Sequence, residues 1–206
     1  MKKIIVGLVG TSGSGKNEAA ACFSKYDAAL IDADCVAKKI LDAHQSEIIG
    51  MFESVCPAVK NSDGSLNKKV LAAFLFSHKD DLRRHEKFML PLIEKEIRSF
   101  LRTTPQKLIV LNAPTLHKTD LINDVDCFIY VTAAFWIRAV RVHKRDSLSL
   151  KDTLLRFKNQ KNFFSAYKKT EKKTYVIKNN GSKKNLQKKI DTVVHDLFLH
   201  KESFPS

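Results

Sequence analysis

The stretch formed by residues 3–17 constrains the fold more than any other part of this chain. Residues 4–9 form an apolar run of strand length, and residues 18–23 have the composition of a helix. Between them lies the pattern Gly-x-x-x-x-Gly-Lys, which ends at Lys16. Backbone N–H groups in such a glycine-rich turn, together with a helix N-terminus, form a cradle for phosphate. The stretch therefore predicts a P-loop in which Lys16 reaches the β- and γ-phosphates of a nucleotide.

The last residue of the predicted loop departs from the usual motif. That position normally carries Ser or Thr, whose hydroxyl binds Mg²⁺, whereas this chain has Asn17. An amide oxygen is also a suitable ligand for a hard cation, so Asn17 remains a candidate magnesium ligand. The competing interpretation is a glycine-rich turn beside a chance lysine. The predicted phosphate-binding residues are Gly10, Thr11, Ser12, Gly13, Ser14, Gly15, Lys16 and Asn17.

Two aspartates follow the next apolar run, residues 28–31. Asp32 and Asp34 come just after this predicted strand, at the end where α/β sheets bind their ligands. In extended backbone, side chains at i and i+2 share a face, so we expect both carboxylates to face one cleft. Beside a P-loop, such a pair suits proton removal from an attacking hydroxyl and binding of Mg²⁺ through water, with Asp32 as the metal candidate. The alternative is that Asp34 caps a helix over residues 35–43.

The rest of the chain alternates between strand and helix patterns. Residues 46–104 are mostly helical in pattern, with Pro91 as a predicted kink or boundary. Ser149 is a predicted helix start. Further strands are predicted at 107–112, 126–131 and 175–177, and further helices at 135–144, 150–160 and 186–197.

Composition limits the class of protein. A chain of 206 residues with 44% hydrophobic residues predicts one α/β domain with a core of its own. No apolar run approaches the roughly 20 residues of a membrane span, so we expect no membrane association. The four cysteines are scattered, which indicates neither a disulfide framework nor a zinc site and favours the reducing cytoplasm.

The net charge of +14 is concentrated in one segment. Residues 141–190 hold 16 Lys and Arg against three acidic residues, a net charge of +13. Such a segment favours polyanionic partners, either phosphate-rich small molecules or nucleic acid. The alternative is a solvated basic surface.

Further motifs are spread over nearly the whole chain. Besides the glycine loop, they are Ile31-Asp32-Ala33-Asp34, Asp63-Gly64-Ser65-Leu66, Pro91-Leu92-Ile93, Pro114-Thr115-Leu116, Arg145-Asp146-Ser147-Leu148-Ser149, Arg156, Gln160 and Val176-Ile177-Lys178-Asn179-Asn180-Gly181-Ser182. Together these motifs resemble those of the dephospho-coenzyme A kinase family. The resemblance implies a three-layer P-loop fold in one domain over residues 1–206, with a five-stranded parallel sheet. Its expected parts are a nucleotide-binding core (1–45 and 105–137), a helical acceptor-binding region (46–104), a lid (138–172) and a closing strand and helix (173–200).

The resemblance also implies a reaction and roles for residues. The reaction is transfer of a phosphoryl group from ATP to the ribose 3′-hydroxyl of dephospho-coenzyme A, with Mg²⁺. Asp34 is implied as the general base and Asp32 as its assistant, while Lys16 and the loop hold the ATP phosphates. Arg145 is implied as a lid arginine that neutralises charge on the transferring group or packs by the adenine. The residues implied near the adenine are Asn179 and Gly181.

Four positions depart from the family pattern: Asn17, Leu90, Asn112 and Lys118. Each change removes a polar or acidic group that the pattern places near the cleft, which predicts weaker or absent catalysis. Alternatives therefore stay open: a kinase of similar fold for another nucleotide or nucleoside, or a degenerate fold that binds ATP or coenzyme A without catalysis. A nucleic-acid binder that uses the basic segment is a further alternative.

Overall fold

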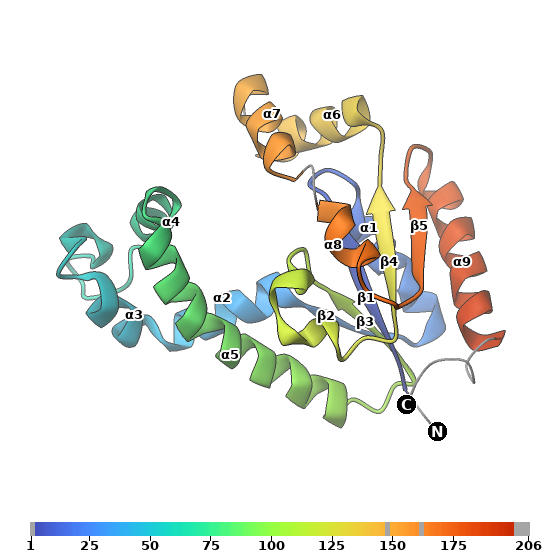
Figure 1. Ribbon diagram of the computed structural model, residues 1–206, viewed down its shortest axis with the longest axis horizontal. Helices are drawn as coiled ribbons and strands as arrows, with labels where there is room; N and C mark the ends of the chain where they lie inside the picture. Colours follow the sequence, from blue (N-terminus) through green and yellow to red (C-terminus); the bar gives the residue numbers. More distant parts are fainter. Residues whose placement is uncertain (1–2, 147–148, 161–162, 200–206) are drawn as a thin grey trace. The chain divides into compact units, whose positions relative to one another are not determined.

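The strands form one five-stranded parallel sheet, as the family resemblance implies. The computed structural model describes residues 3–146, 149–160 and 163–199 (Figure 1), so that Ser147 and Leu148 of the quoted motifs lie outside the described residues. The strand order is β2-β3-β1-β4-β5, and every neighbouring pair is parallel. The strands are β1 (Ile4–Gly10), β2 (Ala29–Asp32), β3 (Leu108–Asn112), β4 (Cys127–Thr132) and β5 (Thr174–Lys178).

The central strand β1 shows why apolar runs in the sequence predict the strands of this sheet. It pairs with β3 on one side and β4 on the other, and nearly all its residues are buried. A parallel strand covered on both faces requires apolar side chains on both, which gives a continuous run instead of an alternation. Strand order also reverses beside β1, and ligands bind at such a switch point in open α/β sheets. The P-loop follows β1 at this place.

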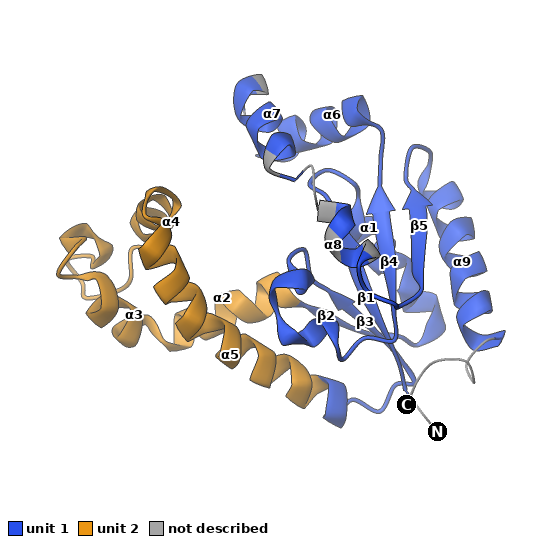
Figure 2. Ribbon diagram, viewed as in Figure 1, with its two compact units in different colours: residues 1–32, 101–206 blue, residues 33–100 orange. Residues whose placement is uncertain are grey.

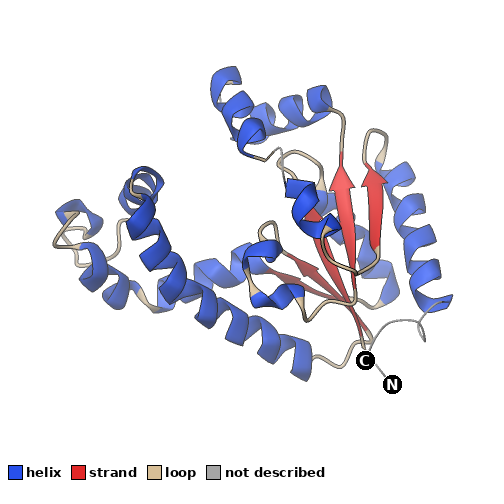
Figure 3. Ribbon diagram, in the orientation of Figure 1, coloured by secondary structure: helices blue, strands red, loops and turns tan. Residues whose placement is uncertain are grey.

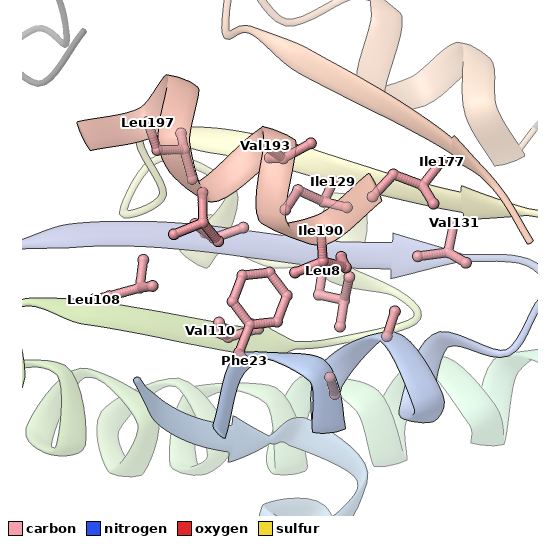
Figure 4. Packing of buried hydrophobic residues seen from close by; sticks show 14 of the residues in the cluster. Leu8, Phe23, Leu108, Val110, Ile129, Val131, Ile177, Ile190, Val193 and Leu197 are labelled. Atoms are coloured by element: carbon pink, nitrogen blue, oxygen red, sulfur yellow. The ribbon is translucent and has the colours of Figure 1, made fainter. Parts of the chain in front are cut away.

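Helices lie beside the strands of the sheet (Figure 3), and most side chains of the central strands are buried. On one face, α1 (Lys16–Ala21) and α9 (Lys183–Leu199) pack over the strands and contribute to one apolar cluster. The side chains labelled in Figure 4 belong to this cluster: Leu8, Phe23, Leu108, Val110, Ile129, Val131, Ile177, Ile190, Val193 and Leu197. On the other face, Phe128 of β4 contacts the ring of Tyr167 in α8 (Phe163–Lys168), a helix that the sequence patterns did not predict.

The chain forms two compact units, shown in different colours in Figure 2. The first comprises residues 1–32 and 101–206 and holds the sheet, and the second comprises residues 33–100. The second is helical, as predicted for this region. Its helices are α2 (Ala33–Ala43), α3 (Gln45–Phe52), α4 (Lys68–Ser77) and most of α5 (Lys79–Thr103), and the short turn η2 (Pro57–Val59) lies among them.

Pro91 does not end a helix, so of the two predicted alternatives, a kink or a boundary, the boundary is wrong. It lies inside α5, which continues for a further three turns. Pro91 is exposed, whereas Met89 and Ile93 beside it are buried. Packing of the apolar stripe outweighs the one backbone hydrogen bond that proline removes.

Two further helices follow β4 and lie in the predicted lid. They are α6 (Phe135–Asp146) and α7 (Leu150–Asn159). The predicted start at Ser149 is confirmed, because its hydroxyl accepts a hydrogen bond from the backbone N–H of Asp152 at 3.1 Å. None of the helices within the described ranges is long and apolar enough to cross a bilayer. Short 3₁₀ turns complete the first unit at η1 (Cys22–Tyr26), η3 (Leu116–Lys118) and η4 (Asp120–Ile122).

Candidate active site

The loop between β1 and α1 adopts a backbone that two of its glycines make possible. Gly13 and Gly15 have φ values of +76° and +84°, in the left-handed region that other residues rarely adopt. A Cβ on Gly15 would lie only 2.2 Å from Nδ2 of Asn179. Gly15 is also the N-cap of α1, which begins at Lys16. The predicted P-loop is therefore present as a tight turn that leads directly into a helix N-terminus.

The carbonyl groups of this loop are held by side chains from two distant segments. Asn179, buried at the end of β5, donates from Nδ2 to the carbonyl oxygen of Ser14 at 3.0 Å. Arg141 of α6 donates from Nη1 to the carbonyls of Gly13, Ser14 and Asn179 at 3.2 to 3.4 Å. Fixing these carbonyls fixes the peptide planes of the loop, and so the directions of its N–H groups.

Ser12 is held from both sides by the two helices of the predicted lid. Arg138 of α6 donates from Nε to the carbonyl oxygen of Ser12 at 2.9 Å. The N–H of Ser12 donates to Oε1 of Gln160, which follows α7, at 3.0 Å. The guanidinium carbon of Arg138 also lies 4.1 Å from the ring centre of Phe157, a cation–π contact between α6 and α7. Both helices are thereby attached to the phosphate-binding loop.

A chain of three side chains lies at the carboxyl ends of β2 and β3. Lys16 donates from Nζ to Oδ1 of Asn112 at 2.6 Å, and Asn112 donates from Nδ2 to Oδ2 of Asp32 at 2.6 Å. The same Nδ2 lies 3.3 Å from Oδ1 of Asn17. The strand register makes the arrangement possible, because Asp32 is paired directly with Asn112 across β2 and β3. The catalytic candidates Lys16 and Asp32 therefore meet through Asn112.

Asn112, one of the four departures from the family pattern, keeps a polar group at this point of the site although it lacks an acidic one. The residue is 2% exposed, and its side chain makes hydrogen bonds to a cation, a carboxylate and an amide. Polar groups buried to this degree are costly unless they are satisfied, and Asn112 is satisfied on both sides of its amide.

The two aspartates are not placed as the i, i+2 argument predicts. Asp32 ends β2, and α2 begins at Ala33 with no loop between them, so Asp34 lies in the first turn of the helix. The extended backbone that would put both carboxylates on one face is absent at Asp34. The alternative role as a cap also fails, because Asp34 lies within the helix, although an acidic residue in the first turn does favour the helix dipole. Asp34 is exposed and belongs to the second unit.

Arg145 and Gly181 are not brought to the loop by any contact described in the structure. Arg145 donates to both carboxylate oxygens of Asp146, from Nε at 2.6 Å and from Nη2 at 3.0 Å, and Arg156 binds the same carboxylate. The hydrogen bond from Arg145, followed by that from Arg156, lowers the pKa of Asp146 to about 2. Gly181 lies beside Asn185, whereas Asn179, the other predicted adenine neighbour, binds the loop itself.

The oxygen atoms near Asn112 are chemically suited to a hard cation. Oδ1 of Asn17 and Oδ2 of Asp32 both accept from the same amide nitrogen, so they lie on one side of Asn112. Mg²⁺ in nucleotide sites takes one or two protein oxygens and completes its shell with water and phosphate oxygens. Within the described ranges there is no cluster of three or more His, Cys, Asp or Glu that would form an all-protein cage. The donor set therefore fits a Mg²⁺ ion shared with a nucleotide.

Sequence reasoning missed Arg138 and Arg141 as parts of the site, and it quoted Gln160 only as a motif residue without a role there. A usable signal was present, because positions 138 and 141 share one face of the helix that follows β4.

Part of the basic segment, residues 141–190, has a structural role that is separate from the site. Lys172 donates from Nζ to the carbonyls of Ile122, Asn123 and Val125 at 2.6 to 2.9 Å and so ties down the turn before β4.

Comparisons with known proteins show to which family the chain is similar. The sequence profile of a family described as dephospho-CoA kinase matches residues 4–185. A dephospho-CoA kinase of Treponema denticola is 40% identical over 195 residues, which are 91% of this chain and 87% of the relative. A solved structure from Thermus thermophilus, 25% identical, has a TM-score of 0.82 and covers 96% of this chain and 99% of its own. The solved dephospho-CoA kinase of Campylobacter jejuni shares the fold at 21% identity, with a TM-score of 0.70 over 96% of this chain and 98% of its own. This chain therefore belongs to the dephospho-CoA kinase family.

Proposed function

We propose that this protein transfers the γ-phosphoryl group of ATP to the ribose 3′-hydroxyl of dephospho-CoA, in the cytoplasm. Family membership supports the reaction class. The observation that carries the proposal for this chain is the connected set of Lys16, Asn112 and Asp32 beside the P-loop. Phosphoryl transfer depends on positioning and on stabilisation of charge, and these residues supply an ammonium and a carboxylate in fixed positions. This favours an active kinase over a degenerate fold.

The loop residues Gly10 to Asn17 hold the ATP phosphates in this proposal. Their N–H groups and the ammonium of Lys16 neutralise the charge that develops on the β- and γ-phosphates. Asn179 and Gly181 lie next to the adenine of ATP in this proposal. Arg145 neutralises charge on the transferring group, and for this it must exchange Asp146, its partner in the structure, for the nucleotide.

Asn17 and Asp32 are proposed to hold Mg²⁺, Asn17 through its amide oxygen and Asp32 through water. When bound, the ion supplies positive charge to the phosphate oxygens. The geometry is compatible with this role, because Oδ1 of Asn17 and Oδ2 of Asp32 both accept a hydrogen bond from Nδ2 of Asn112 and so lie close to one another.

Asp34 is proposed as the general base, and residues 46–104 as the acceptor-binding region. The carboxylate of Asp34 takes the proton of the 3′-hydroxyl while the new P–O bond forms and ADP leaves. Position in the sequence supports this role, because Asp34 follows Asp32, the last residue of β2, by two residues.

Replacing Asp34 with Asn tests the proposal. We expect kcat with Mg²⁺-ATP and dephospho-CoA to fall by about 10²- to 10⁴-fold, the usual effect of losing a general base, while ATP affinity changes less than about twofold. A coupled assay of ADP release and a fluorescent ATP analogue measure the two quantities. Asp42→Asn is the matched control, because Asp42 lies on the same helix and only pairs with Lys68 at the surface. An unchanged kcat in Asp34→Asn would remove Asp34 from this role.

A further inference from the structure

We propose that Asn112 is a positioning residue that fixes the ammonium of Lys16 for the nucleotide phosphates and ties it to Asp32. This inference rests on the proposed function, since it assigns Lys16 to phosphate binding. The three side chains come from different elements, namely α1, the end of β3 and the end of β2. One buried amide bonds to both Lys16 and Asp32 in the structure.

The amide of Asn112 is confined to one orientation by its partners. A lysine ammonium only donates hydrogen bonds, and an ionised carboxylate only accepts them. Oδ1 must therefore face Lys16 and Nδ2 must face Asp32, and the bond of Nδ2 to the oxygen of Asn17 agrees with this orientation. A flip of the amide would place donor against donor and acceptor against acceptor. The chain of bonds thus has a direction set by chemistry.

The side chain of Asn112 is uncharged, which suits a lysine that must also bind phosphate. A carboxylate at this position would stand beside that of Asp32 and form an ion pair with Lys16, which would compete with phosphate for the ammonium. An amide oxygen engages the ammonium without a full counter-charge. A lysine Nζ has three donors, and the bond to Asn112 uses one of them. Lys16 can therefore keep Asn112 as a partner while it binds a nucleotide.

Fixing Lys16 before the nucleotide arrives improves affinity. A lysine side chain has a flexible four-carbon stem, and ordering it on binding costs affinity. The bond to Asn112 already restricts that stem in the structure. Loss of Asn112 should therefore weaken nucleotide binding through Lys16, and measuring binding without Mg²⁺ leaves the proposed Mg²⁺ ligands Asn17 and Asp32 out of the effect.

A double-mutant cycle on ATP affinity tests this dependence. Asn112→Leu, which keeps the size but removes the three hydrogen bonds of the amide, is made in the natural background and in Lys16→Met. We expect Asn112→Leu to weaken binding of a fluorescent ATP analogue, measured without Mg²⁺, by about tenfold in the natural background and by less than about twofold in the Lys16→Met background. The smaller Asn112→Ala replaces the leucine variant if the latter does not fold.

The control separates positioning from a general effect on structure. The control residue is Asn67, the cap of α4, whose side-chain oxygen accepts a hydrogen bond from the backbone N–H of Val70. Asn67→Ala should therefore lower the unfolding temperature without changing nucleotide affinity. An equal loss of affinity for Asn112→Leu in both backgrounds would overturn the positioning role. Because the readout is nucleotide binding, the proposed acceptor could be wrong without changing this result. A natural protein that bound no ATP would overturn both proposals.

Discussion

Replacing Lys16 by methionine is expected to lower kcat for phosphoryl transfer by about 10³-fold. Removal of a single fixed hydrogen-bond donor to a developing negative charge costs about 10²- to 10³-fold in other enzymes, and Lys16 carries a full positive charge. Methionine has a similar length and no charge, so it should fill the same space without binding phosphate. It also removes the partner of Asn112 Oδ1.

ADP release with dephospho-CoA measures this effect, and Lys25→Met is the matched control. Lys25 lies in η1 of the same unit and binds Asp191 at the surface, a pair of the kind that contributes little to stability. The control should keep the kcat of the natural protein. A Lys16→Met variant within tenfold of the natural kcat would show that catalysis does not depend on the P-loop lysine.

Gly15→Ala is expected to destabilise the protein by about 1–3 kcal/mol and to lower ATP affinity by at least about 10²-fold. Gly15 has φ of +84°, and strain of this kind in a non-glycine residue costs about that much. Its Cβ would also lie 2.2 Å from Nδ2 of Asn179, the atom that binds the carbonyl of Ser14. The substitution thus displaces the side chain that holds the loop in shape.

Chemical denaturation and nucleotide titration measure these two effects, with Gly50→Ala as the opposite case. Gly50 lies within α3, and a Cβ there would have no heavy atom within 4 Å. Alanine should therefore stabilise the helix by about 0.5–1 kcal/mol and leave ATP affinity unchanged. If Gly15→Ala behaved like Gly50→Ala, the tight loop geometry would not be needed for phosphate binding.

The sequence predicted the sheet and the phosphate-binding loop well because both depend on local patterns. A strand buried on both faces requires an apolar run, as in β1, and a left-handed turn favours glycine, as at Gly13 and Gly15. Motifs spread over the chain then led to the family, which the comparisons confirm.

The bonds made by Asn112 could not be predicted, because they depend on strand order. Asp32 and Asn112 are 80 residues apart, and only the adjacency of β2 and β3 places them in register. From the sequence alone, Asn112 was only a missing acidic group. Its value as a neutral link between opposite charges follows from its neighbours in space.

The attachment of the lid helices to the loop was missed for the same reason. The spacing of Arg138 and Arg141 places both on one face of α6. Only the folded sheet brings the P-loop to this face. The boundary alternative at Pro91 is wrong for another reason, because burial of the residues around it outweighs the local rule that proline ends a helix.

The most direct test of the central claim is the choice of phosphoryl acceptor by the natural protein. Mg²⁺-ATP is supplied with dephospho-CoA, adenosine or a nucleoside monophosphate, ADP release is followed, and the product is located by phosphorus NMR. We predict turnover with dephospho-CoA at least about 10²-fold faster than with the others, and a new phosphate on the ribose 3′-oxygen. Turnover only with a different acceptor, or no transfer from bound ATP, would contradict the account.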